Sequence, residues 1–141
     1  MQIPIDHYAS GEYLYDRLCA PVCQEYGLTH MEFVVLMFLA NNPGYDTAAQ
    51  IVRYRRLTKS HVSLAVRALL EKRLLIGVDG VDDRRTIHLS LTEDAEEIVD
   101  AGRQVQQQFF ATIFEGFSQE EREQMGQFMN RIDENIKKNI V

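Results

Sequence analysis

The sequence predicts a mainly α-helical domain that carries one small β-hairpin (an α+β class), and three observations support this. In several segments apolar residues recur every three or four positions, which is the spacing of helices with one buried face. Residues 86–91 instead alternate, so that Ile87, Leu89 and Leu91 share one side of an extended strand. The 141 residues are 45% hydrophobic and 26% charged, which is typical of an ordinary globular domain. We therefore expect a single domain over residues 1–141.

Capping residues predict where several helices begin. A first helix should cover about residues 5–26, with Pro21 kinking or restarting it and Gly27 ending it. Three capping boxes follow, in each of which a hydroxyl residue precedes a Glu or Gln by three positions: Thr29 and Glu32, Thr47 and Gln50, and Ser118 and Glu121. They predict a buried helix, a short helix and the last helix of the chain, in that order.

After the short helix that begins at Thr47, we expect another helix and then a hairpin. The helix should cover about residues 58–72. Residues 74–79 can then pair with residues 86–91 as a hairpin, in which Gly80 supplies the backbone freedom that a turn needs. Helix, tight turn, helix and hairpin predict a winged helix-turn-helix core over residues 29–94. In that geometry the second helix enters the major groove of DNA and the hairpin, or wing, straddles the backbone.

The remaining segments, residues 1–28 and 95–141, are expected to be dimerisation helices. A long helix should begin at Thr92, and the last helix carries a continuous apolar stripe of Met125, Phe128, Met129, Ile132, Ile136 and Ile140. Left alone, such faces would expose a larger apolar patch than monomers usually tolerate. A two-fold dimer would bury them and place two recognition helices about one DNA turn apart. The alternative is that both terminal helices fold back on their own core.

The charges are unevenly distributed along the chain. The net charge is −6, but residues 53–85 contain nine Lys or Arg and four Asp or Glu, a local charge of +5. Local rather than total charge attracts a nucleic acid. The polar side of the second helix carries Lys59, Ser60, His61, Ser63 and Arg67, and the hairpin turn carries Arg84 and Arg85. These groups can meet phosphates and base edges, although a charged hairpin can also be simply solvated.

Two motifs give the chain a family resemblance. Asp83-Arg84-Arg85 followed by Leu89-Ser90-Leu91-Thr92 fits the wing pattern D-x-R, a few residues, then L-x-L-T. Leu28-Thr29 before the buried helix and residues 57–63 at the second helix fit as well. Over essentially its whole length the chain resembles MarR-family transcriptional regulators. It departs from their pattern at Ala95 and Arg73, which stand where the family usually has glycine.

The resemblance implies a ligand-responsive repressor that binds a palindromic operator in double-stranded DNA as a homodimer. It adds Thr58 to the DNA-contacting residues and places Arg85 in the minor groove and Arg84 near the backbone. Asp83 would hold the wing in shape through an ion pair. A small-molecule effector of unknown identity would bind between the terminal helices and the core, where we expect Tyr13, His30 and Phe33 to approach it.

Other functions have weaker support in the sequence. Cys19 and Cys23 share one helix face and are either a redox switch or two small buried residues, of which we favour the second. The four histidines lack the spacing of metal ligands and no nucleophile or phosphate-loop motif occurs, so we expect no enzyme activity, no metal and no cofactor. With no apolar span and no export signal, we expect a cytoplasmic protein without a membrane partner. A winged helix that binds protein without binding DNA, and a cysteine-based redox-sensing regulator, stay as alternatives.

Overall fold

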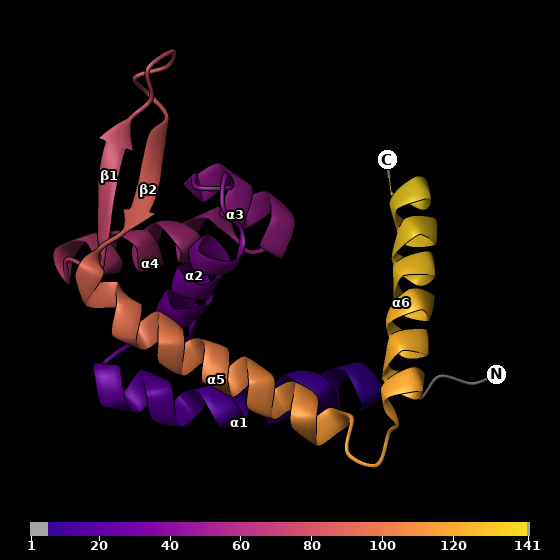
Figure 1. The fold of residues 1–141 in the computed structure, drawn as a ribbon. Helices are drawn as coiled ribbons and strands as arrows, with labels where there is room; N and C mark the ends of the chain where they lie inside the picture. Colours follow the sequence, from indigo (N-terminus) through magenta and orange to yellow (C-terminus); the bar gives the residue numbers. More distant parts are fainter. Residues whose placement is uncertain (1–5, 141) are drawn as a thin grey trace. The chain divides into compact units, whose positions relative to one another are not determined.

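The computed structural model describes residues 6–140 of the chain, with side chains from residue 9 onward. It confirms the predicted mainly helical class with one antiparallel hairpin (Figure 1). The elements are α1 (Asp6–Tyr26), α2 (His30–Asn41), α3 (Ala48–Arg55), α4 (Lys59–Glu71), β1 (Leu75–Asp79), β2 (Ile87–Leu91), a 3-10 turn (Glu93–Ala95), α5 (Glu96–Ile113) and α6 (Gln119–Asn139). The chain divides into two compact units, residues up to 107 and residues from 108, which we describe separately.

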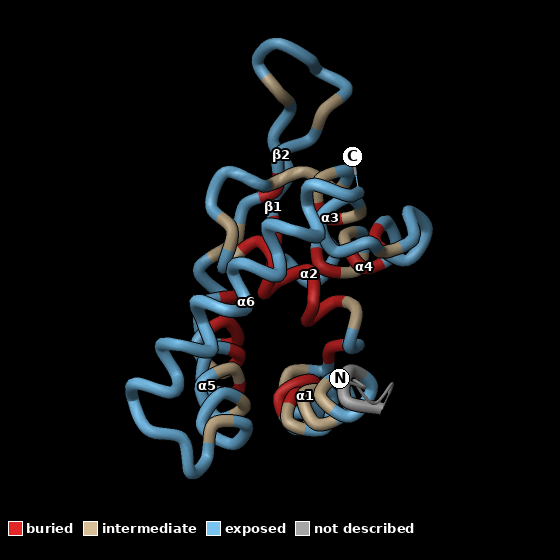
Figure 2. Tube along the Cα trace, turned by 90° about the vertical axis from the view of Figure 1, so that its right-hand side faces the viewer, coloured by how far each residue is buried: buried red, intermediate tan, exposed pale blue. Residues whose placement is uncertain are grey.

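Helix α2 is the centre of the first unit. Its residues from Glu32 to Leu39 are all buried, because α1, α4 and β2 contact it. One apolar cluster joins α2 to α3, α4, the hairpin and the start of α5. A second cluster joins Phe33 and Met37 of α2 to Cys19 of α1 and Val105 of α5. Figure 2 shows the buried residues gathered on α2 and on the elements around it.

The three predicted capping boxes are present, and each starts the helix expected of it. Helix α1 runs through Pro21 without a break, so the expected restart does not occur; residue 5, its predicted start, lies outside the described residues. A helix was expected to begin at Thr92, and Thr92 is the N-cap of a 3-10 turn that leads into α5 at Glu96. Its hydroxyl makes no capping hydrogen bond and instead donates to the carbonyl oxygen of Arg73 at 2.7 Å.

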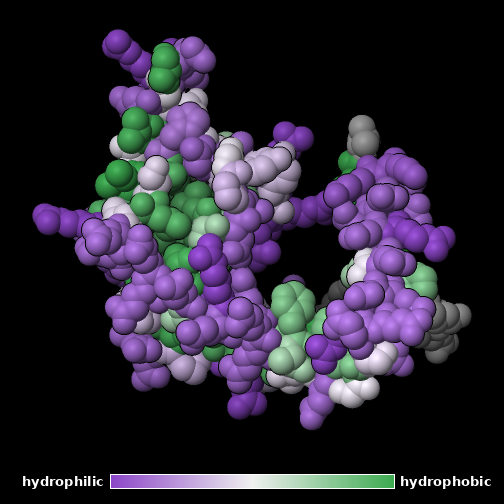
Figure 3. Space-filling model, in the orientation of Figure 1, coloured by the Kyte–Doolittle hydropathy of each residue, from purple (hydrophilic) through white to green (hydrophobic). Residues whose placement is uncertain are grey.

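The hairpin is anchored at its base. Leu75 pairs with Leu91 and Gly77 with Leu89, and Leu75 and Leu89 are buried. Ile87, which was expected on the buried face of the strand, is 50% exposed, because the hairpin extends beyond the helices that could cover it. Figure 3 shows the resulting apolar surface along the hairpin. The outer edge of β2 is held by Asp46, whose carbonyl oxygen accepts a hydrogen bond from Leu89 N at 2.8 Å.

The second unit contains the end of α5 and all of α6. Ser118 Oγ accepts a hydrogen bond from Glu121 N and starts α6, and Arg122 donates to the carbonyl oxygen of Phe114 at 3.1 Å. The predicted apolar stripe runs along α6, and all of its members are exposed: Met125, Phe128, Met129, Ile132, Ile136 and Ile140. No helix within residues 6–140 is long and apolar enough to cross a membrane.

Candidate nucleic-acid interface

Helix α4 presents one face to the core and the other to solvent. Thr58 is its N-cap, and its hydroxyl accepts a hydrogen bond from His61 N at 3.4 Å. Val62, Ala65 and Leu69 are buried, whereas Leu70 is 37% exposed. The predicted contact residues are all exposed: Lys59, Ser60, His61, Ser63 and Arg67.

The middle of the exposed face of α4 includes an apolar residue that was not predicted there. Because successive helical residues turn by about 100°, the direction opposite to the buried residues is occupied by Ser60, Leu64 and Arg67. Lys59 and His61 lie to either side of this line. Leu64 is 61% exposed but is not among the predicted contact residues, which were chosen for their polar or charged groups. A helical projection of α4 would have found it.

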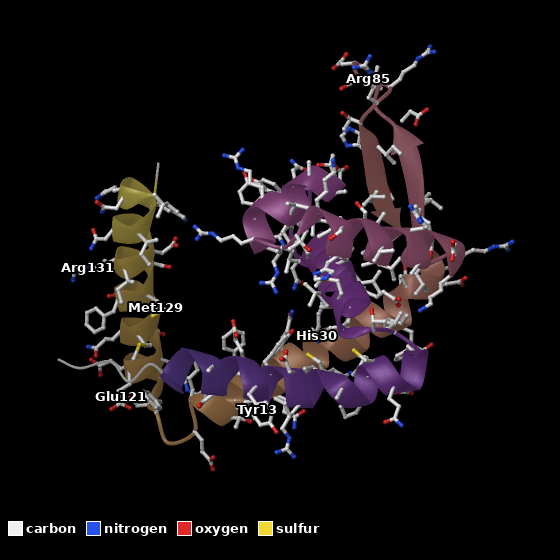
Figure 4. The ribbon with its side chains drawn as sticks, turned by 180° about the vertical axis from the view of Figure 1, so that it is seen from behind. Tyr13, His30, Arg85, Glu121, Met129 and Arg131 are labelled. Atoms are coloured by element: carbon white, nitrogen blue, oxygen red, sulfur yellow. The ribbon has the colours of Figure 1, made fainter. Side chains whose placement is uncertain are left out.

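The wing tip is shaped by Asp83. Its carboxylate accepts hydrogen bonds from Arg85 N at 2.9 Å and from Thr86 Oγ1 at 3.1 Å, and its carbonyl oxygen accepts one from Thr86 N at 3.0 Å. The resemblance implies an ion pair at Asp83, whereas the contacts that the structure shows are hydrogen bonds. Arg84 and Arg85 are exposed, and Arg85 lies at the tip of the hairpin (Figure 4).

Gly80 permits this compact turn. Its backbone N donates to the carbonyl oxygen of Thr86 at 2.8 Å. A Cβ at position 80 would lie 2.6 Å from the carbonyl oxygen of Asp83. Only glycine therefore lets the two sides of the turn approach so closely.

The basic segment contains cations with different surroundings. Lys72 Nζ lies 2.6 Å from Glu32 Oε2 and 2.8 Å from the carbonyl oxygen of Gly27, and Glu32 is buried. Lys72 is thus a structural residue. Arg53 lies over the ring of Tyr54, with its Cζ 5.5 Å from the ring centroid.

Arg55 is exposed. Burial raises the pKa of Tyr15, and the positive charge of Arg55 is among the influences that oppose that shift. The other cations of α4 and the wing make no ion pair within residues 6–140: Lys59, Arg67, Arg84 and Arg85. These four side chains are therefore available to meet phosphates.

The ends of both helices in the helix-turn-helix are left-handed. Arg56 after α3 has φ of 51°, and Arg73 after α4 has φ of 58°. This conformation favours glycine. Arg73 stands where the MarR family usually has glycine, and its backbone adopts the left-handed conformation that a glycine would adopt there. For a residue with a side chain this conformation costs backbone strain.

The two cysteines are buried. Cys19 has no exposed surface, and burial raises its pKa to about 11, with a hydrogen bond to Tyr15 acting in the opposite direction. Burial also raises the pKa of Cys23. Because the thiolate is the reactive form, these surroundings favour the structural role over the redox switch.

The residues expected near an effector have separate surroundings. Tyr13 and His30 are labelled in Figure 4: Tyr13 is exposed and its ring lies under Arg17, and His30 Nε2 is 3.2 Å from Asp16 Oδ1. Phe33 is buried in the core. A groove of about 400 Å³ lies elsewhere in the first unit, and none of the three lines it. Its lining comes from α2, the end of β2 and α5: Leu39, Ala40, Pro43, Leu91, Thr92, Glu96, Val99, Asp100 and Arg103. Within residues 6–140 no group of three or more His, Cys, Asp or Glu is placed to hold a metal ion.

Comparison with known proteins supports the resemblance read from the wing motif. Residues 26–86, from the end of α1 to the wing tip, match the model of the MarR family. This segment is therefore similar to the MarR family over its helix-turn-helix and most of its hairpin. The matched segment contains α2, α3, α4, β1 and Asp83-Arg84-Arg85. No curated protein matches this chain.

Several solved structures share the fold of this chain at low sequence identity. One is described as a MarR family transcriptional regulator from Listeria monocytogenes complexed with a 26mer DNA (18% identity, 99% of this chain and 91% of that chain, TM-score 0.83). Another is a mutant of Staphylococcus aureus MepR bound to an oligodeoxyribonucleotide (19% identity, 96% and 99%, TM-score 0.61). A third is Staphylococcus aureus MarR in complex with salicylate and kanamycin (23% identity, 88% and 83%, TM-score 0.71).

Proposed function

We propose that this chain is a sequence-specific, double-stranded DNA-binding transcriptional regulator with no enzyme activity. The observation that carries the proposal is a set of four cations that form no ion pair with the described part of the chain: Lys59 and Arg67 on α4, and Arg84 and Arg85 on the wing. In a winged helix these two elements face DNA. In this geometry α4 enters the major groove. Arg85, at the wing tip, is suited to a narrow and negative minor groove.

Related structures support the partners that we assign. The Listeria monocytogenes protein and MepR are bound to DNA, and Staphylococcus aureus MarR is in complex with salicylate. By analogy, we propose a repressor that leaves its operator when a small molecule binds. Such a protein acts where the DNA is, which is the cytoplasm of a bacterial or archaeal cell.

We further propose that the regulator is a homodimer joined through its terminal helices, with the stripe of α6 buried against a second copy. The first turns of α6 carry Glu120, Glu121 and Glu123, and its last turn carries Lys137 and Lys138. An antiparallel pair of α6 helices about a two-fold axis would place each acidic end beside the partner's basic end. A palindromic operator matches this symmetry.

Sedimentation of matched α6 variants tests the dimer. Ile132→Glu puts a charge in the stripe and should yield a monomer at micromolar concentration. Gln127→Glu adds the same charge on the opposite side of the helix and should leave the dimer intact. A monomeric wild type, or an Ile132→Glu variant that still dimerises, would contradict the proposal.

Selection of bound sequences from random duplex DNA, followed by salt titration, tests the function. Arg85→Ala should weaken binding to the selected duplex and lower the slope of log affinity against log salt by about 1.8 per dimer, because each wing loses one phosphate-neutralising charge. Arg131→Ala, an exposed cation of α6 outside the core (Figure 4), is the matched control and should change neither. If the wild type binds no duplex at low salt, DNA binding is excluded and the protein-binding alternative gains.

A further inference from the structure

The exposed face of α4 has an apolar residue at its centre. Leu64 is 61% exposed and lies between Ser60, one turn before it, and Arg67, one turn after it. Core packing does not explain it, because the buried face of the same helix is complete with Val62, Ala65 and Leu69. The branched apolar side chain of Leu64 thus lies between the hydroxyl of Ser60 and the guanidinium of Arg67 along the exposed face.

The charge around Leu64 indicates what covers it. Arg67 lies on the same face, Lys59 lies in the first turn of the same helix, and the wing adds two further exposed arginines within the same unit. A polyanion is therefore the partner that this face attracts. In the major groove of a DNA duplex, the apolar feature that a side chain can meet is the C5-methyl group of thymine.

We propose that Leu64 is a specificity-determining residue that packs against a thymine methyl group in each half of the operator. This inference rests on the proposed DNA-binding function and extends it to one base. Arg67 and Ser60 can bind phosphates or base edges on either side of Leu64, so the helix face combines polar contacts with one apolar contact. The selected duplex should therefore contain, in each half-site, a position at which thymine is preferred over cytosine.

Replacement of thymine by deoxyuridine isolates this contact, because it removes the methyl group and leaves base pairing unchanged. Each thymine of the selected duplex is replaced in turn, and the affinity of the full-length protein is measured. At one thymine per half-site the wild type should bind about fourfold more weakly, the effect expected for one methyl group withdrawn from an apolar contact. Leu64→Ala should show no penalty at that position, whereas Leu64→Met, which keeps an apolar side chain, should retain it.

Leu70→Ala is the matched control, since Leu70 is a partly exposed leucine of the same helix that lies about 120° around the axis from Leu64. It should keep the wild-type penalty. Helical content is measured for each variant. A wild type that tolerates every deoxyuridine, or a folded Leu64→Ala variant that keeps the penalty, would overturn the inference while DNA binding stands. Failure of the wild type to bind any duplex would overturn both.

Discussion

Replacing Asp83 by alanine should weaken DNA binding through the shape of the wing. The change removes two side-chain hydrogen bonds, from Arg85 N and from Thr86 Oγ1. A hydrogen bond of this kind contributes about 0.5–1.5 kcal/mol. Because the site is exposed and water can replace the lost partners, we take the lower part of this range, so that loss of both bonds costs about 1–2 kcal/mol of turn order. The wing must be ordered when it meets DNA, and we expect roughly a 5- to 30-fold loss of affinity per half-site.

The matched control for this prediction is Asp82→Ala. Asp82 carries the same charge one position earlier, but no side-chain hydrogen bond involves it within the described part of the chain. Asp82→Ala removes only a negative charge near the DNA, so its affinity for DNA should be unchanged or slightly higher. Fluorescence anisotropy of a labelled duplex at fixed salt measures both variants. If Asp83→Ala binds as tightly as Asp82→Ala, the hydrogen bonds do not order the wing and the reasoning fails.

Three further predictions concern the scaffold. Cys19, with its pKa raised to about 11, should react with iodoacetamide much more slowly in the folded protein than in urea at pH 7.5. The free energy of unfolding should also fall as the pH rises from 9 towards 11, because the thiol ionises at a lower pH in the unfolded chain than in the folded one. Lys72→Met leaves the buried carboxylate of Glu32 without its cation and should lower the free energy of unfolding by about 1–3 kcal/mol. Adding Glu32→Gln should restore part of the lost stability. An unchanged urea titration for Lys72→Met would contradict the structural role of Lys72. Arg73→Gly should raise the melting temperature by relieving about 1 kcal/mol of left-handed strain, whereas an unchanged or lower value would show that Arg73 makes compensating contacts.

Local patterns predicted the helix starts well, because both partners of a capping box lie within one turn. The pairs Thr29 with Glu32 and Ser118 with Glu121 form as expected. Thr92 has an equally suitable residue type, yet its hydroxyl contacts the carbonyl of Arg73, nineteen positions away. The hairpin brings these two residues together, and no local pattern contains that pairing.

The candidate surface was predictable as a region but not residue by residue. Charge counting identified the basic segment, and the wing pattern identified Arg84 and Arg85. Counting could not show that Lys72 is paired with Glu32, because the two lie forty positions apart and meet only in the folded chain. Leu64 was overlooked for a different reason, since the predicted contact residues were chosen for their polar or charged groups and Leu64 is apolar.

Lys72 fixes one end of α4, so a rotation of the helix about that end displaces its other end the most. This one ammonium group contacts residues at the end of α1 and the start of α2, and Lys72 is itself the last cap of α4. From there to Ser60 the helix extends about 18 Å at 1.5 Å per residue. A rotation of about 5° around the Lys72 end would displace Ser60 by about 1.6 Å, which exceeds the range over which a hydrogen bond to a base persists. Small angular changes at the Lys72 end of the helix are thus magnified at Ser60, which lies at the end that the proposed function places in the major groove.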